Sequence, residues 1–480
     1  MTESKKIKTT TDRELILPNK KIINLNDEQY EGVKKIRLWL KTKNKTFFTL
    51  SGHAGSGKST LIKKILDEYR GGVAVSAMTH KAKKIIARTT KRSSTTLHSL
   101  LGLRPDLELE NFSPNNPQFA PIAMSRINDY NWIVIDEVPQ MNLQLLELIK
   151  EKTKNSKVKI LFVGDACQLP PIGEKISMVF VDDEIEKHFL TKVERQTDGN
   201  PLLPMYDTLR DNLNTVDGGI ERRTKINANG DGIIFTIDKA EFRKAVLSKF
   251  KSDEYKNNID FCKGLAWKND TVMSANKLVR DELFGKNADI VEVGDVIMGY
   301  RSISDEKNRY NIIDNSADYY VIEKSNLEEN AYGIKGFRVK IKEELETGRF
   351  KYEDVFIIDV NDNNNLYLYA QMHDFFREMG KSDKKQWYKY YQFRRNNLLM
   401  KTIDKNINGD YRDKNEIIVK DIYYGFFITI HKSQGSTYTH SLVIESDINL
   451  NWDIVERNKL RYVAMSRPER TCTVLSNKLD

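Results

Sequence analysis

The sequence contains no run of about 18 consecutive apolar residues, so no transmembrane helix is expected. Cysteine is scarce: Cys167, Cys262 and Cys472 lie far apart, which excludes a disulfide framework and a cysteine-rich zinc site. No apolar segment follows Met1–Lys6, so no secretory signal peptide is expected. Internal repeats and low-complexity linkers are also absent. These absences favour a globular protein of a reducing compartment.

The composition indicates several folded domains. The chain has 480 residues, which at about 150 residues per domain predicts about three domains. Aromatic residues make up 10 %, which excludes a mostly disordered chain. Lysine and arginine number 77 against 68 acidic residues, a net charge of +9 that weakly favours a polyanionic partner.

Short apolar segments alternate with helical patterns in the first 200 residues. The expected strands cover residues 47–51, 73–77, 132–136 and 158–163, and a helix is expected to begin at Asn26–Glu28. Alternation of apolar strands with helices is typical of a parallel sheet covered by helices on both faces. The fold class is therefore predicted to be α/β.

Changes of pattern divide the chain into expected domains. Residues 1–20 are a polar, unpatterned tail, and residues 104–122 surround a turn-rich segment typical of an inserted β-hairpin. Residues 290–415 are richer in short β-like runs. The expected organisation is a first α/β domain over 21–103 and 123–195, a hairpin over 104–122, a second α/β domain over 196–289 and 416–480, and a β-rich insert over 290–415.

One motif predicts nucleotide binding directly. Residues 52–59 read GHAGSGKS, which fits G-x-x-x-x-G-K-[ST] between a predicted strand and a predicted helix. Glycines let backbone N–H groups surround phosphate oxygens, and the helix N-terminus favours negative charge. Lys58 is expected on the β- and γ-phosphates and Ser59 on Mg²⁺. The candidate ATP-binding residues are Gly52, Gly55, Ser56, Gly57, Lys58, Ser59 and Thr60.

A second acidic motif ends the strand predicted at 132–136. Asp136 is expected to bind Mg²⁺, and Glu137 is expected to activate the attacking water. A strand that ends in two solvated acids is common, but here the pair follows a complete phosphate-binding loop. The sequence therefore predicts an ATP hydrolase.

The further motifs resemble those of superfamily 1 class B helicases, the branch that contains the Dda-like and RecD-like helicases. They lie at residues 76–82, 96–99, 164–173, 190–196, 429–436 and 462–467, in the order found in that family. The resemblance covers about residues 24–300 and 415–480. It implies two RecA-like motor domains, with a β-hairpin pin inserted in the first and an SH3-like, β-barrel-containing domain inserted in the second.

The resemblance also assigns roles at the nucleotide. Gln29 is implied to read the adenine edge, and Gln168 to report the state of the γ-phosphate. Arg195 and Arg467 are implied to stabilise the charge on the transferred phosphoryl group. A surface ion pair is the alternative for each arginine. Asn276 and Arg280, near Ala266–Asn269, match a further stretch for which a structural role is equally good.

The contacts to nucleic acid follow from the same resemblance. The implied contact residues are Thr79, His80, Lys81, Thr96, His98, Ser99, His431, Lys432, Ser433 and Gln434. Phe112 or Phe119 of the hairpin could stack on the base pair at a fork, although packing in a core is an equal alternative. A lysine- and aromatic-rich helix is expected over 384–395.

The implied function is an ATP-dependent DNA helicase that moves 5′ to 3′ on single-stranded DNA, with ATP and Mg²⁺ as cofactors. Replication, recombination and repair are the candidate processes. Expected partners are single-stranded DNA and forked duplex, with single-strand-binding, replisome or recombination proteins as further candidates. No membrane is involved, and a functional monomer in the cytoplasm (of a host, if a phage encodes the chain) is expected. An RNA helicase or a nucleoprotein remodeller of superfamily 1 remains the alternative, because a motor that grips the backbone need not read the 2′-hydroxyl.

Overall fold

The computed structural model describes residues 12–16, 22–69, 71–105, 119–121, 124–171, 173–193, 199–306, 310–345, 347–404 and 417–480. The chain divides into two compact units. The first comprises residues 1–78, 82–102 and 122–199, and the second comprises residues 79–81, 103–121 and 200–480. No helix in the described ranges is long and apolar enough to cross a membrane.

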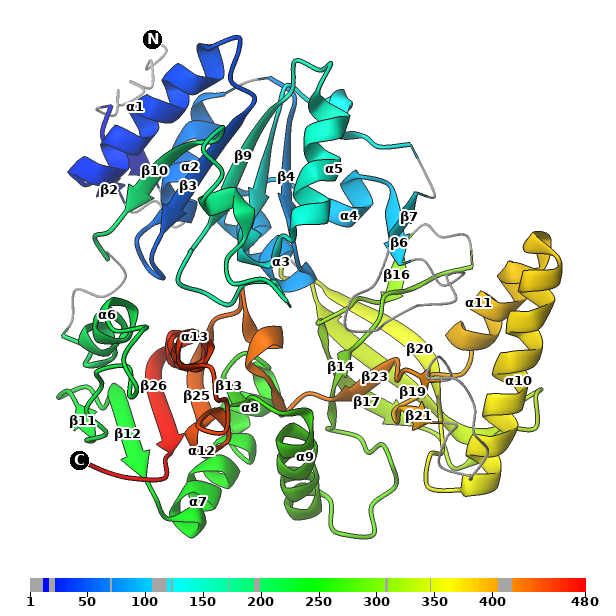
Figure 1. Cartoon of the computed structure of the whole chain (residues 1–480). Helices are drawn as coiled ribbons and strands as arrows, with labels where there is room; N and C mark the ends of the chain where they lie inside the picture. The colour runs from blue at the N-terminus through cyan, green and yellow to red at the C-terminus, as the bar shows by residue number, and fades with distance from the viewer. Residues whose placement is uncertain are drawn as a thin grey trace, which may run out of the picture. The chain divides into compact units, whose positions relative to one another are not determined.

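The first unit is built on a six-stranded parallel sheet (Figure 1). The strand order is β10-β3-β9-β8-β4-β5. The strands are β3 (Phe47–Gly52), β4 (Val73–Ala77), β5 (Ser94–Thr96), β8 (Trp132–Asp136), β9 (Lys159–Gly164) and β10 (Glu186–Leu190). The four strands predicted from the sequence are confirmed to within one residue at each end.

Helices cover both faces of this sheet. The chain passes from β3 to β4 in one direction across the sheet and from β8 to β9 in the other, so right-handed connections place α2 and α5 on opposite faces. The helices are α1 (Asp27–Lys41), α2 (Lys58–Glu68), α3 (His80–Thr90), α4 (Leu97–Leu100), α5 (Leu143–Thr153), η1 (Ile127–Asp129), η2 (Val138–Gln140) and η3 (Met178–Phe180). Residues of α1, α2 and the central strands share one buried core.

A small hairpin precedes α1, where the sequence led us to expect an unpatterned tail. β1 (Glu14–Ile16) pairs antiparallel with β2 (Ile22–Asn24). The apolar Leu15 is only 3 % exposed, and its burial explains why this part of the predicted tail is ordered. Residues 1–11 and 17–20 of the predicted tail lie outside the described residues.

The second unit contains a six-stranded sheet in the order β11-β12-β26-β25-β13-β24. All neighbouring strands are parallel except the pair β11 and β12. The strands are β11 (Lys225–Ile226), β12 (Gly232–Thr236), β13 (Cys262–Ala266), β24 (Phe427–Thr429), β25 (Tyr438–Ile444) and β26 (Pro468–Leu475). The helices around it are α6 (Leu202–Asp211), α7 (Lys239–Phe250), α8 (Asp253–Asn257), α9 (Asn269–Leu283), η6 (Ile430–Ser433), α12 (Glu445–Ile448) and α13 (Ile454–Met465).

An antiparallel sheet interrupts this second α/β fold. β19 lies between β20 on one side and β17 and β18 on the other, and β14 and β23 extend the sheet beyond β17. The strands are β14 (Val296–Gly299), β17 (Asp318–Lys324), β18 (Glu328–Glu329), β19 (Lys335–Glu344), β20 (Phe350–Ile358) and β23 (Ile422–Tyr424). Because β23 is part of it, the sheet continues past the boundary predicted at residue 415.

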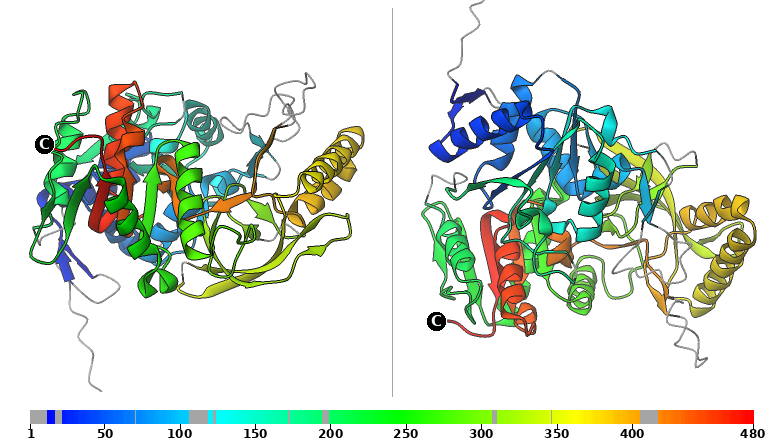
Figure 2. Two further views of the ribbon diagram at one scale, coloured as in Figure 1. Left: turned by 90° about the horizontal axis from the view of Figure 1, so that it is seen from below. Right: turned by 45° about the horizontal axis from the view of Figure 1, so that its top comes forward.

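Several shorter elements complete the second unit. Helices α10 (Asn363–Ser382) and α11 (Trp387–Arg395) pack side by side (Figures 1 and 2). The predicted lysine- and aromatic-rich helix is formed by η4 (Lys384–Gln386) and α11, and its Phe393 is buried against Tyr369 of α10. The remaining strands form three pairs: β6 (Leu103–Pro105) with β7 (Phe119–Pro121), β15 (Ile303–Ser304) with β16 (Asn311–Ile313), and β21 (Ile403–Asp404) with β22 (Ile417–Ile418).

Candidate functional site

The predicted catalytic segments of the first unit meet at one edge of its parallel sheet. Ser51 is in register with Gly164, and Ala77 is in register with both Asp136 and Thr96. The carboxyl ends of β3, β9, β8, β4 and β5 therefore share one edge. In open α/β sheets, ligands bind outside the carboxyl ends of the strands. This edge is the candidate nucleotide site.

The loop between β3 and α2 has the conformation of a phosphate cradle. Gly55 and Gly57 both have φ of +82°, a backbone region that suits glycine. Gly57 is also the N-cap of α2, so the loop leads directly into a helix N-terminus. A Cβ atom on Gly57 would lie 2.3 Å from Nε2 of Gln29. The backbone conformation therefore favours glycine at both positions, and close packing against Gln29 also requires it at position 57.

Lys58 folds its side chain over this loop. Its Nζ donates hydrogen bonds to the backbone oxygens of Gly52, at 2.6 Å, and His53, at 2.9 Å. These bonds hold the ammonium group beside the backbone that the motif predicts to surround phosphate. Lys58 is therefore well placed to exchange carbonyl oxygens for phosphate oxygens.

Gln29 is a buried residue at the start of α1, with 4 % of its surface exposed. Its Oε1 accepts a hydrogen bond from the backbone N–H of Asn26, and its Nε2 donates to the backbone oxygen of Ser56 at 3.0 Å. Asn26 in turn caps the helix by accepting from the Gln29 N–H. The alternative of an exposed helical glutamine is excluded, and the amide braces the phosphate-binding loop.

Asp136 and Glu137 lie where β8 ends. The Asp136 Oδ1 accepts the backbone N–H of Glu137 at 3.0 Å. Burial and the negative charge of Glu137 raise the pKa of Asp136 to about 7, against opposing effects of that N–H and of Lys58. Two acids held together in this way favour a cation between them. Glu137 has φ of +57°, a strained conformation for a non-glycine residue of the kind that clusters at functional sites.

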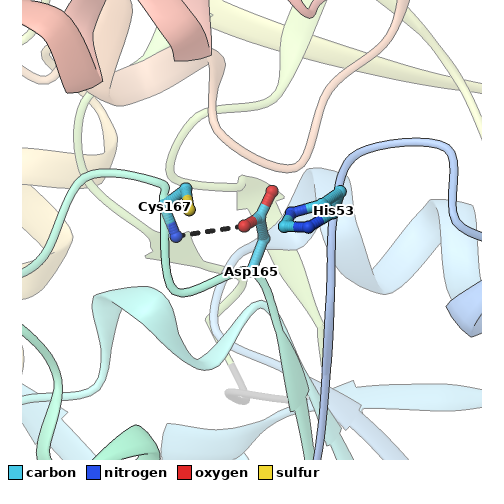
Figure 3. Close-up of side chains that lie close together, drawn as sticks. All are labelled: His53, Asp165 and Cys167. Carbon is cyan, nitrogen blue, oxygen red and sulfur yellow. Dashed lines mark hydrogen bonds between the residues drawn. The ribbon is translucent and has the colours of Figure 1, made fainter. Parts of the chain in front are cut away.

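The segment after β9 approaches the phosphate-binding loop. The donor atoms of His53, Asp165 and Cys167 all lie within 4.8 Å of one another, and Figure 3 shows the His53 ring facing Asp165. The Cys167 N–H donates to Asp165 Oδ1 at 3.0 Å, and the Gln168 N–H donates to the Asp165 backbone oxygen. These bonds form a tight turn, and the buried Gln168 directly follows the residues that lie beside His53 of the loop.

The residues present fit ATP with Mg²⁺. Ser56 Oγ and Gln168 Oε1 are buried and have no hydrogen-bond partner among the described residues. Unpaired buried polar atoms are costly, and a polar ligand would satisfy them. Ser59 and Asp136 would hold the metal ion, and the loop N–H groups with Lys58 would hold the phosphates. His53, Asp165 and Cys167 are also donor types that Zn²⁺ accepts, but their position places them with the phosphate site.

The predicted contact residues of the 76–82 segment have other partners. Lys81 pairs with Asp318 at 2.6 Å, and His80 Nδ1 lies 3.2 Å from Asp314, all within the second unit. Burial alone lowers the pKa of Lys81, but the Asp318 carboxylate outweighs burial and raises it. Lys81 is therefore charged and engaged by a carboxylate. Thr79 is partly exposed between β4 and α3.

The segment at 96–99 forms a helix start. Thr96 is the N-cap of α4, and its Oγ1 accepts the backbone N–H of Ser99 at 3.3 Å. His98 is partly exposed and Ser99 is exposed. The hydroxyl of Thr96 thus has a capping role, whereas Ser99 and His98 present surface that a ligand can reach.

In the second unit, the segment at 429–436 mixes buried and accessible side chains. Ser433 and Gln434 are buried, and Ser433 Oγ donates to the backbone oxygen of Ile430. His431 and Lys432 are partly exposed. Burial lowers the pKa of His431, which favours the neutral form of its ring. The two accessible residues are the better candidates for ligand contact.

Arg467 joins two predicted motifs within the second unit. Its Nη1 donates to the backbone oxygen of Ser436 at 3.2 Å, and its Nε donates to the backbone oxygen of Val463 at 3.0 Å. Asn276 has a structural role nearby, because its side-chain amide pairs with the backbone N–H and oxygen of Phe427 on the edge strand β24. Arg195 and Phe112 lie outside the described residues, and Phe119 is described only as part of β7.

Comparisons with known proteins agree with this site. The family model described as "AAA domain" matches residues 24–227. An uncharacterised protein of Acanthamoeba polyphaga mimivirus is 24 % identical over 92 % of this chain and 98 % of its own length. The ATP-dependent DNA helicase dda of Enterobacteria phage T4 is 28 % identical over 52 % of this chain and 55 % of its own length. The ATP-dependent RecD2 DNA helicase of Deinococcus radiodurans is 31 % identical, over 36 % of this chain and 25 % of that protein.

Solved structures support the fold. A Pif1 helicase from a study of DNA unwinding at forked duplex aligns with a TM-score of 0.52 and 17 % identity, covering 95 % of this chain and 93 % of its own. This similarity, the parallel sheet of the first unit and the largely parallel sheet of the second support the predicted RecA-like helicase fold. Together with the sequence relatives, they confirm that the chain resembles the superfamily 1 class B helicases of the Dda and RecD-like kind.

Proposed function

We propose that this chain is an ATP-dependent DNA helicase that moves 5′ to 3′ on single-stranded DNA and unwinds duplex. One observation carries the proposal: Lys58, Asp136 and Gln168 follow neighbouring parallel strands and meet at one edge of a single sheet. An ATP hydrolase needs a phosphate ligand, a metal ligand and a γ-phosphate sensor at such an edge. The sequence relatives that share this region include two named DNA helicases.

The residues of the first unit have distinct tasks in hydrolysis. ATP supplies the γ-phosphoryl group, and Mg²⁺ would supply positive charge that offsets the negative charge of the phosphates. Lys58 would neutralise the phosphate oxygens, and Ser59 and Asp136 would hold the metal ion. Glu137 accepts the proton of the attacking water. Its strained backbone conformation holds the carboxylate at the end of β8, where that water would attack.

Coupling to nucleic acid is proposed for two segments. Gln168 lies one short turn after β9 and would change its contacts when the γ-phosphate leaves. In the second unit, the bond from Arg467 to Ser436 would carry a change at that arginine to the 429–436 segment, which holds His431 and Lys432. Alternating grip on a single strand by such segments produces stepping. Arg195 and Arg467 keep the phosphate-stabilising roles that the resemblance implies.

The finer parts of the proposal concern substrate and process. We assign the hairpin that contains β6 and β7 as the pin that separates strands, and the antiparallel sheet of the second unit as the barrel-containing insert. Forked DNA is the proposed substrate, and replication, recombination or repair is the proposed setting.

The experiment that tests the proposal is ATP-dependent strand separation on three matched DNA duplexes: 5′-tailed, 3′-tailed and blunt. Displacement from the 5′-tailed duplex alone is the expected result. Preference for the 3′ tail would overturn the direction. Stimulation of ATP hydrolysis by RNA but not by DNA would replace the proposal with an RNA helicase, and DNA-stimulated hydrolysis without displacement would replace it with a remodeller.

A further inference from the structure

Two lysines and two tyrosines of the second unit form a compact group, here called the Lys/Tyr cluster: Tyr300, Lys420, Tyr423 and Lys432. Lys420 Nζ lies 4.3 Å from the ring centroid of Tyr300 and 4.2 Å from that of Tyr423. Lys432 Nζ lies 4.1 Å from the ring centroid of Tyr300. All four residues are partly exposed.

Strand pairing brings these residues together from distant parts of the chain. Met298 of β14 is in register with Tyr423 of β23, and the Tyr300 N–H donates to the backbone oxygen of Asp421 at 2.7 Å. Residues two apart on adjacent antiparallel strands lie within reach of each other when one is aromatic. The two rings meet edge to face, with centroids 6.5 Å apart and planes at 86°. Lys432 enters from η6, the segment that the sequence predicts to contact nucleic acid.

The cluster carries cationic groups without carboxylate partners. Among the described residues, no ion pair engages Lys420 or Lys432, and the hydrogen bonds of Lys432 Nζ go to the neutral oxygens of Asn315, at 3.4 Å, and Ser316, at 3.5 Å. Burial lowers the pKa of Lys420 to about 8. Burial, followed by the charges of Lys420 and Lys81, lowers the pKa of Lys432 to about 7.

Two other lysines of the second unit, Lys81 and Lys263, differ from Lys420 and Lys432 because a carboxylate pairs with them. Lys81 and Lys263 share the Asp318 carboxylate at 2.6 and 3.2 Å, so their charges are satisfied within the protein. Crowding two unpaired ammonium groups is unfavourable unless an anion joins them. Aromatic rings interleaved with such cations are the usual composition of a surface that tracks single-stranded nucleic acid, because rings stack on bases and ammonium groups bind phosphates.

We propose that Tyr300, Lys420 and Tyr423, which lie outside the helicase motifs, form a contact site for single-stranded DNA together with Lys432 of the 429–436 motif. The inference rests on the proposed function and extends it to three residues that no motif includes. Lys420 and Lys432 bind backbone phosphate. As the Lys420 ammonium moves from the ring faces to the phosphate, a face of Tyr300 or Tyr423 becomes available to a base.

The test measures binding of a labelled oligothymidylate to the full-length chain by fluorescence anisotropy over a series of salt concentrations. Lys420→Gln is expected to weaken binding several-fold and to reduce the salt slope by about one. Tyr423→Leu is expected to weaken binding by roughly 5-fold or more without changing that slope. Lys420→Arg is expected to keep the affinity, which separates loss of a contact from damage to the fold.

The same antiparallel sheet offers matched controls. Lys342 Nζ lies 4.0 Å from the ring centroid of Phe350, and Tyr352 is 53 % exposed, so Lys342→Gln and Tyr352→Leu remove the same chemistry elsewhere. Both controls are expected to bind as the unchanged protein does. Cluster variants that match the controls in affinity and salt slope would overturn the inference. If the unchanged protein itself fails to bind the oligonucleotide, the proposed function fails instead.

Discussion

The side-chain amide of Gln29 donates a hydrogen bond to the backbone oxygen of Ser56, 27 residues later in the chain, at 3.0 Å. The same amide closes the capping box of α1 through Asn26. A single buried side chain therefore links a helix N-terminus to the phosphate-binding loop. This geometry gives Gln29 a positioning role in addition to the adenine contact that the resemblance implies.

Substitution of Gln29 should weaken ATP binding more than turnover. Gln29→Ala removes both bonds, and loss of about 1–2 kcal/mol of loop stabilisation corresponds to a KM for ATP raised roughly 5- to 30-fold. Gln29→Glu keeps the acceptor for Asn26 but loses the donor to Ser56, so it isolates the loop contact. Steady-state hydrolysis with a range of ATP concentrations measures the effect. An unchanged KM for ATP in both variants would show that the hydrogen bond from Gln29 to Ser56 does not stabilise the phosphate-binding loop for ATP binding.

Lys58→Ala should abolish hydrolysis while leaving binding of single strands largely intact. The side chain is the only lysine in the phosphate-binding motif, and removal of one charge-stabilising group from a transition state lowers kcat by roughly 100-fold or more. Lys34→Ala, on the exposed face of α1, is the matched control and should hydrolyse ATP normally. Phosphate release and oligonucleotide anisotropy are the two measurements. Full turnover by Lys58→Ala would refute the phosphate role.

Glu137→Gln should bind ATP but turn it over slowly. The amide is isosteric and leaves the φ of +57° as it is, so only the proton acceptor is lost. Loss of a general base typically lowers the rate by about 10²–10⁴. Single-turnover hydrolysis separates this chemical step from nucleotide binding, and Glu147→Gln on the solvent side of α5 serves as the control. Weak ATP binding by the variant, with a normal rate once saturated, would contradict the assignment.

The nucleotide site could be predicted from the sequence because its signals are local. Residues 52–59 specify glycines, a lysine and a hydroxyl within one turn, and the strand before them is apolar enough to be recognised. The convergence of β3, β8 and β9 then follows from parallel pairing, since the carboxyl ends of such strands share an edge.

The Lys/Tyr cluster could not be predicted in the same way. Tyr300 and Lys420 are 120 positions apart, and only the register of β14 with β23 makes them neighbours. The ion pair of Lys81 could not be predicted from the sequence either, because its partner Asp318 lies 237 positions away. Long-range pairing of this kind leaves no periodic pattern, so side-chain partners remain unknown until the strands are placed.

Binding of single-stranded DNA should become weaker as pH rises from about 7 to 9. Lys420, with a pKa near 8 before binding, loses its charge over this range, and phosphate binds only the protonated form. Burial raises the pKa of Tyr300 and Tyr423, so both rings stay neutral, while the Asp318 carboxylate keeps Lys81 charged. Lys432, with a pKa near 7, loses its charge in the lower part of the range.

The control for this pH dependence is Lys420→Arg, because a guanidinium stays protonated across the whole range. Anisotropy titrations at several pH values should show a smaller loss of affinity above pH 8 for this variant than for the unchanged protein. If affinity falls with pH equally in the two proteins, Lys420 does not bind a backbone phosphate.

The stability of the second unit should depend strongly on Glu445. This carboxylate is fully buried, accepts from Arg222 Nη2 at 2.8 Å and from Ser476 Oγ at 2.7 Å, and pairs with Arg461 Nε at 3.0 Å. Glu445→Gln removes the buried counter-charge of two guanidinium groups and leaves Arg222 with the more distant, half-exposed Asp217 at 3.9 Å, which costs about 3–5 kcal/mol. Asp281→Asn, which breaks the exposed pair with Lys277, should cost less than about 1 kcal/mol. Urea unfolding measures both variants. If the urea midpoint of Glu445→Gln equals that of Asp281→Asn, the two arginines find other partners. A much lower midpoint for Glu445→Gln would show that the contacts among Arg222, Glu445 and Arg461 hold α12, α13 and the segment before β11 to one core.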